Sequence, residues 1–167
     1  EDLGRWDVHP SGGEYFTTYR NAYRTQVDVV LRDGCSVLNA GDEIVASLAE
    51  LSDGEVIFFA ADPACPVMAE QIAAGRRGVF VRDARIILAT GSEEIRLCRL
   101  GDVPMIGRQK DPATVANVLA AVAAGWALGL TREVIVTGVK TFGLELPDPA
   151  ALLPQGARRS PQATFRN

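Results

Sequence analysis

The feature that most constrains the fold is a repeated change of hydrophobic period in the first half of the chain. Cys35–Asn39 and Glu55–Ala60 are short, largely apolar runs typical of buried strands. Between them, Asp42–Leu51 carries apolar residues at helical spacing, and Gly54 follows as a helix stop. Because neighbouring parallel strands need a crossover that a helix usually supplies, this order predicts a parallel α/β layer.

The next part of the chain predicts an antiparallel arrangement. Gly78–Arg82, Arg85–Ala89 and Glu94–Leu100 are three strand-like runs, joined by turn signals at Asp83-Ala84 and Thr90-Gly91-Ser92. Short strands joined by tight turns favour a meander. The fold class predicted for the whole chain is therefore α/β, with a parallel-rich sheet, flanking helices and a small antiparallel meander.

Two further elements are expected before this layer. Residues 14–26 place tyrosines at helical spacing and predict an amphipathic helix. Val27–Leu31 then has strand character, and the turn signal Asp33-Gly34 separates it from Cys35. We expect this run to be a short strand.

The second half of the chain predicts two helices. Gly101–Asp111 contains Pro104 and is expected to be a loop. Pro112–Leu130, rich in Ala, Leu and Val, has the strongest helical pattern of the chain and begins at Asp111-Pro112. Thr131 is expected to cap a second helix that reaches about Phe142.

Length and composition indicate one folded unit. The 167 residues are 47% hydrophobic and 23% charged, which is close to the average of globular domains and excludes a disordered, fibrous or coiled-coil chain. We expect one core over residues 1–145. Residues 146–167 are rich in Pro, Ala and Arg and are expected to form a tail or linker.

Charge and cysteine content exclude other classes. The formal charge of −4 offers no general field for nucleic acid or an anionic membrane, and no apolar run is long enough to span a bilayer. The three cysteines, Cys35, Cys65 and Cys98, form no CxxC pair, so we expect reduced thiols and a cytoplasmic protein. The chain starts at Glu1 rather than at a methionine, which suggests that it was cut from a longer protein or processed.

Few residues point to chemistry on their own. Neither a GxxxxGK(S/T) phosphate loop nor a GxGxxG motif is present, and the single histidine, His9, lies in a loose N-terminal stretch, which argues against a catalytic triad. Asn39 ends a strand, where α/β sheets bind ligands. Asp42 either holds a cation or caps the next helix, and its residue type favours the cap. Asn117 either recognises an adenine edge or is an ordinary exposed helix residue. Cys65 is expected to be a packed or surface thiol rather than a nucleophile.

Several segments resemble the Mur-ligase-like half of cyanophycin synthetase. They are RTQVDVVL, LNAGDE, GVFVRDARIILATGSEEIRL and NVLAAVAAGWALG, and the resemblance extends over roughly residues 1–145. It implies part of a Mur ligase central domain. It also implies an ATP- and magnesium-dependent amide ligase, which adds arginine to the β-carboxylates of an aspartate polymer through an acyl phosphate.

The resemblance also assigns site residues. Asn117 matches the asparagine that contacts the nucleotide base, and Asn39 and Asp42 match the NADD element that follows the central strand. Arg24 falls near the position of a modified lysine that helps to hold magnesium. The sequence departs from the family at Gly41, where an aspartate is frequent, and in EDLG at the start of the chain, where Asp2 replaces a common histidine.

Two functions follow as hypotheses. In the first, the chain is part of the ligase without its phosphate loop, so the fragment alone should be inactive. Its partners would be the remaining parts of the parent chain and the aspartate/arginine polymer. The parent is expected to be a homo-oligomer, and neither nucleic acid nor a membrane is expected as a partner. An unpaired sheet edge is then expected. In the second, the altered elements belong to a degenerate, non-catalytic module with a structural or oligomerisation role.

Overall fold

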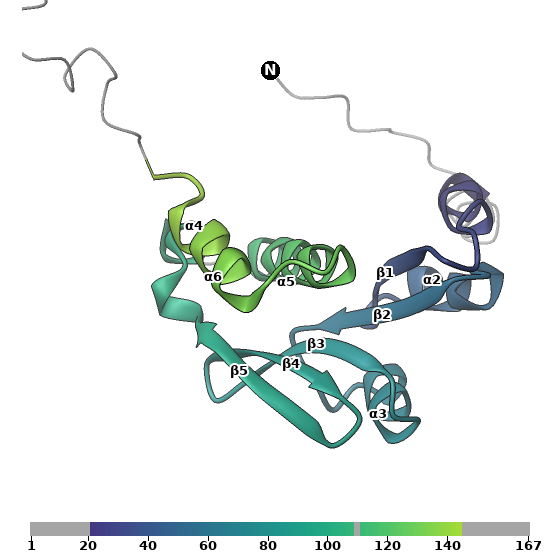
Figure 1. Ribbon diagram of the computed structural model, residues 1–167, viewed down its shortest axis with the longest axis horizontal. Helices are drawn as coiled ribbons and strands as arrows, with labels where there is room; N and C mark the ends of the chain where they lie inside the picture. Colours follow the sequence, from purple (N-terminus) through teal and green to yellow (C-terminus); the bar gives the residue numbers. More distant parts are fainter. Residues whose placement is uncertain (1–20, 109–110, 145–167) are drawn as a thin grey trace, which may run out of the picture.

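A five-stranded mixed sheet organises the part of the chain that this computed structural model describes, residues 21–108 and 111–144 (Figure 1). Its strands are β1 (Cys35–Asn39), β2 (Glu55–Ala60), β3 (Arg77–Arg82), β4 (Arg85–Thr90) and β5 (Glu93–Arg99). They lie in the order β1-β2-β3-β4-β5, so each strand pairs with the next one along the chain. The pairs β1–β2 and β2–β3 are parallel, and β3–β4 and β4–β5 are antiparallel. The predicted α/β class, with a parallel layer and a meander, is confirmed.

Both faces of the sheet are buried along the middle of β2, β3 and β4, which explains why these strands are apolar there, whereas β5 is largely charged and exposed. Neighbouring residues point to opposite faces, so Ile57 and Phe59 enter one core cluster while Phe58 and Ala60 enter the other. In β4, Ile86 and Leu88 likewise face the first cluster. Such a sheet needs helices on both sides.

The two parallel connections cover one face. The first consists of α2 (Glu43–Ala46) and the 3-10 helix η1 (Ser47–Leu51), and the second contains α3 (Pro66–Ala73). The sequence pattern did not indicate α3. Within it, Gln71 is buried and its Nε2 donates hydrogen bonds to the carbonyl oxygens of Val56, at 2.8 Å, and Arg77, at 2.9 Å. One amide group thus ties the helix to β2 and β3.

The other face is covered by the C-terminal helices, α5 (Pro112–Ala127) and α6 (Arg132–Thr141), with α4 (Pro104–Arg108) beside them (Figure 1). Both predicted helix starts are confirmed. Asp111 Oδ1 accepts a hydrogen bond from the backbone N–H of Ala113 at 3.1 Å, and Thr131 Oγ1 accepts one from Val134 at 3.4 Å.

Two sequence predictions are wrong. Gly101–Asp111 is not simply a loop, because the 3-10 helix η2 (Leu100–Asp102) and α4 occupy it; Pro104 starts α4, where a fixed φ is favourable. Val27–Leu31 is not a strand, because residues 21–28 are helical. Only Val27 of this run reaches the core, whereas Val29 and Leu31 are exposed.

Other predictions fall outside the described residues. These are the first part of the expected 14–26 helix, His9, Asp2 and the tail at 146–167. Among the helices that are described, none combines the length and apolar character needed to cross a bilayer.

Candidate functional site

The turn that follows β1 is ordered by its own polar side chains. Asn39 Oδ1 accepts a hydrogen bond from the backbone N–H of Gly41 at 2.9 Å. Asp42 Oδ1 accepts two, from Ile44 at 3.0 Å and Val45 at 3.1 Å. Asp42 is therefore the N-cap of α2, as its residue type favoured.

This capping limits what the turn can bind. Two of the first N–H groups of α2 point to Asp42 rather than outward, and the helix is only four residues long. A phosphate group at a helix start needs those N–H groups to be available. The turn therefore forms no phosphate cradle by itself, although Asn39 and Asp42 lie where a ligand of a parallel sheet is expected.

A contact at the opposite edge fixes the direction of α5. Arg77, the first residue of β3, donates a hydrogen bond to the carbonyl oxygen of Trp126 at 3.3 Å, and its guanidinium lies 4.9 Å from the centroid of the Trp126 ring. Trp126 is near the end of α5, so the helix start lies toward the carboxyl ends of β1, β2 and β3. The first turns of α5 and the Asn39–Asp42 turn are consequently at the same edge of the sheet.

Charges at the Arg77 contact are well satisfied. Arg77 forms a two-bond ion pair with Glu55 at the start of β2. This hydrogen bonding lowers the pKa of the Glu55 carboxyl and raises the pKa of the Arg77 guanidinium. Burial, with a smaller effect of Glu55, raises the pKa of the nearby Cys35 thiol, so its protonated form is favoured.

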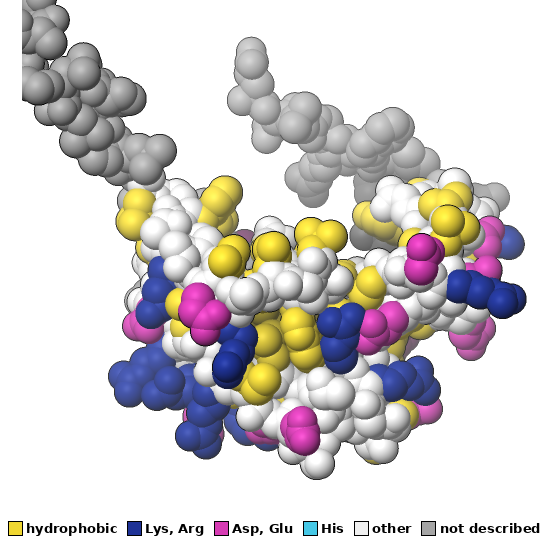
Figure 2. All heavy atoms as spheres, viewed as in Figure 1, with side chains coloured by type: hydrophobic (Ala, Val, Ile, Leu, Met, Phe, Trp, Pro, Cys, Tyr) yellow, Lys and Arg dark blue, Asp and Glu magenta, His cyan; other side chains and the backbone are white. Residues whose placement is uncertain are grey.

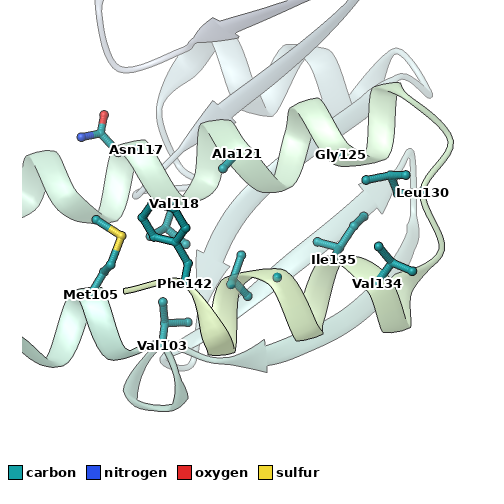
Figure 3. A pocket seen from close by; sticks show the side chains of 12 residues that line it. Val103, Met105, Asn117, Val118, Ala121, Gly125, Leu130, Val134, Ile135 and Phe142 are labelled. Atoms are coloured by element: carbon teal, nitrogen blue, oxygen red, sulfur yellow. The ribbon is translucent and has the colours of Figure 1, made fainter. Parts of the chain in front are cut away.

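Asn117 lies on an exposed part of α5 at the rim of an apolar groove (Figure 3). The groove has a volume of about 430 Å³ and lies between α4, α5 and α6, with Val118, Met105 and Phe142 among its walls. In Figure 3 the amide of Asn117 points away from Val118 and Phe142. The amide is therefore open to a ligand on the outside of α5 and is not part of the groove interior.

The structure does not place all the predicted site residues in contact with one another. Asn39 and Asp42 share one turn, but no hydrogen bond or ion pair within residues 21–108 and 111–144 connects them to Asn117. Arg24 lies on the helical segment 21–28 and forms an exposed ion pair with Asp28 at 3.8 Å. A guanidinium has no lone pair to give to a metal, and the described residues contain no group of three or more His, Cys, Asp or Glu side chains suited to one. These residues do not fit a magnesium site.

The contacts of Arg77, Glu55 and Trp126 were missed by sequence reasoning. Arg77 and Trp126 are 49 positions apart, and a single arginine at a strand start carries no local signal for such a contact. The apolar groove was missed as well, because its walls are ordinary helix residues whose exposure depends on how α5 and α6 pack.

Sequence comparisons relate the chain to two groups of synthetases and ligases. No family model matches it. The cyanophycin synthetases of Synechocystis sp. and Crocosphaera subtropica are 33% and 32% identical to it over 115 residues, which is 69% of this chain and 13% of each relative. The UDP-N-acetylmuramoylalanine–D-glutamate ligase of Symbiobacterium thermophilum is 30% identical over 138 residues, 80% of this chain and 27% of that enzyme.

The chain thus spans only about 13% of the length of the curated cyanophycin synthetases that it matches. The Mur-type match covers 80% of this chain and agrees with the α/β sheet seen here. Over about two thirds of its length, this chain is related in sequence to one segment of the cyanophycin synthetases.

Proposed function

We propose that this chain is part of an ATP-dependent amide ligase that adds arginine to the β-carboxylates of an aspartate polymer. The reaction would convert each carboxylate to an acyl phosphate, which the α-amine of arginine then attacks. The observation that carries the proposal is the sequence similarity to five cyanophycin synthetases, at 26–33% identity, together with the similarity to a Mur-type ligase.

Within the described residues, Asn117 is the best candidate for a nucleotide contact. Its amide both donates and accepts hydrogen bonds, as an adenine edge requires, and it is exposed near the start of α5. Asn39 and Asp42 lie at the same edge of the sheet and would order the turn beside the nucleotide. The phosphate and magnesium contacts would come from other parts of a longer parent, a cytoplasmic homo-oligomer.

A second candidate is a non-catalytic module that braces another domain or a subunit interface. It is favoured by the use of the Asn39 and Asp42 oxygens inside their own turn. Under this hypothesis the turn has a structural task only, and Asn117 is an ordinary exposed helix residue.

A longer protein that includes the sequence on both sides of this chain separates the two candidates. The assay supplies ATP, magnesium, arginine and an aspartate polymer, and measures phosphate release and amide formation. Asn117→Ala should weaken ATP binding about tenfold, because one or two hydrogen bonds to the base are lost. Glu70→Ala, an exposed change on α3 at the other face of the sheet, is the control and should leave ATP binding unchanged.

If Asn117→Ala leaves both ATP affinity and arginine addition unchanged, the non-catalytic module is the better account. The 167-residue chain alone is expected to release no phosphate from ATP. Phosphate release by that chain without added protein would contradict the assignment of the phosphate contacts to other parts of the parent.

A further inference from the structure

Three arginines occupy the same register position on three neighbouring strands. Arg82 ends β3, Arg85 begins β4 and Arg99 ends β5. Arg82 is the direct partner of Arg85, and Arg85 is the direct partner of Arg99. Side chains of directly paired residues project from the same face with Cβ atoms about 5 Å apart. We call these three residues the arginine row.

The row lies on the face of the sheet that α3 partly covers. Phe80, two residues before Arg82, is buried in the cluster on that face, and the guanidinium of Arg82 lies 4.9 Å from the Phe80 ring centroid. Arg96 is paired with Ile87, another member of the same cluster, so it adds a fourth arginine to this face. Figure 2 shows Lys and Arg side chains gathered beside the end of β5.

The positive charge of this face is only partly balanced. Glu94 forms an ion pair with Arg82. No ion pair within residues 21–108 and 111–144 involves Arg85, Arg96 or Arg99. Like charges on directly paired residues destabilise a sheet, so placing Arg85 opposite Arg99 is unfavourable, and the electrostatic interaction of Arg99 with Asp102 offsets this only in part. An anion bound between them would remove this repulsion.

A hollow of about 600 Å³ opens beside Arg85 and Arg99, and the turn Asp83-Ala84 and the backbone at Gly101 form its other walls. Asp83 and Ala84 have φ angles of 51° and 53°, a conformation that L residues other than Asn and Asp rarely adopt. This tight turn brings the start of β4 back next to β3 and so fixes the spacing of the row. The hollow lies at the edge of the sheet where β3 ends. The Asn39–Asp42 turn, which follows the end of β1, lies at the same edge.

We propose that the arginine row and its hollow bind the carboxylates of an extended aspartate-based chain. Planar guanidinium groups bind carboxylates through two parallel hydrogen bonds. Alternate side chains of an extended peptide repeat about every 6.6 Å, and Arg85 and Ile87, the partner of Arg96, are alternate residues of β4. The choice of aspartate as the repeating unit rests on the proposed function.

Nearby acidic groups argue against a nucleic acid as the ligand. Asp83 and Asp102 border the hollow, Glu94 lies further along β5, and the whole chain has a formal charge of −4. Asp102 is itself bound to Lys140, with 3.0 Å between its Oδ2 and the lysine Nζ. A long phosphate backbone would run from the arginines onto these carboxylates, so only a short anionic segment suits the hollow.

The test measures binding of a short fluorescein-labelled oligo-aspartate to the full 167-residue chain by fluorescence anisotropy, without ATP. The double variant Arg85→Gln/Arg99→Gln should lose affinity by about tenfold or more, because two charged hydrogen-bonding groups are removed. The matched control, Arg76→Gln/Arg132→Gln, removes the same charge at two exposed arginines outside the row and should bind as the unchanged chain does. Thermal melts of both variants check that they fold.

Three outcomes would overturn the inference: no binding by the unchanged chain, equal losses in the two double variants, or tighter binding of single-stranded DNA of the same charge. The proposed function is tested separately, because ATP-dependent arginine addition by the longer protein does not enter this measurement. Arginine addition together with failed oligo-aspartate binding refutes the arginine row alone. Binding with no arginine addition refutes the ligase alone.

Discussion

Substitutions of Asp42 separate the capping role of this residue from any ligand role. Its Oδ1 accepts hydrogen bonds from Ile44 and Val45 at 3.0 Å and 3.1 Å, and the side chain is half-buried. Asp42→Ala removes both bonds and should cost about 1 kcal/mol, within the usual range for a lost N-cap. For a domain of this size, that lowers Tm by about 4 °C. Asp42→Asn keeps an oxygen acceptor and should lower the free energy of unfolding by only about 0.3 kcal/mol.

The assay is thermal unfolding of the 167-residue chain followed by circular dichroism, with urea unfolding as a second measure. Glu50→Ala, a change at an exposed carboxylate of η1, is the control and should leave Tm nearly unchanged. Equal losses for Asp42→Ala and Asp42→Asn would refute the capping argument. In the longer protein, a loss of arginine addition by Asp42→Asn without a loss of stability would show a ligand role in addition to the cap.

Two further predictions concern the sheet. Gly54→Ala should lower the free energy of unfolding, measured in urea, by about 2 kcal/mol, because the added methyl would lie 2.6 Å from the carbonyl oxygen of Leu31. Gly138→Ala in α6 has no atom within 4 Å of the added methyl and should be neutral or slightly stabilising. A larger loss of stability for Gly138→Ala than for Gly54→Ala would contradict this account. The pKa of Glu55 is lowered in the folded state by Arg77, so the resulting stabilisation is present above the unfolded pKa of about 4.3 and is lost as pH falls through the folded value. Glu55→Gln should therefore make stability less dependent on pH in the acid range, and an unchanged dependence, measured by urea unfolding at several pH values, would show that the pair contributes nothing.

Local rules predicted the elements whose signals are complete within a few residues. Asp42 and Thr131 were expected to cap helices, and both do so through their side-chain oxygens. The change of hydrophobic period identified β1 and β2 with the bounds that the structure has. In contrast, Val27–Leu31 has the composition of a strand, but tertiary contacts decide its conformation, and only Val27 finds a place in the core.

The remaining features depend on long-range packing. The helix α3 is short, and its buried side includes Gln71, so its apolar stripe is too brief to stand out. The arginine row depends on the register of β3, β4 and β5, which includes an irregularity between Ile86 and Ile87. No pattern along the chain reveals which residues of three separate strands stand side by side.

The order of the strands has a consequence for how this domain forms during synthesis. Because every strand pairs with its successor, the sheet can assemble strand by strand as the chain leaves the ribosome. The helix α5 is made after all five strands, yet it packs across β1 and β2, the first two. Until α5 arrives, one side of the nascent sheet is bare and exposed to chaperones or aggregation, and the docking of α5 is a late, long-range event.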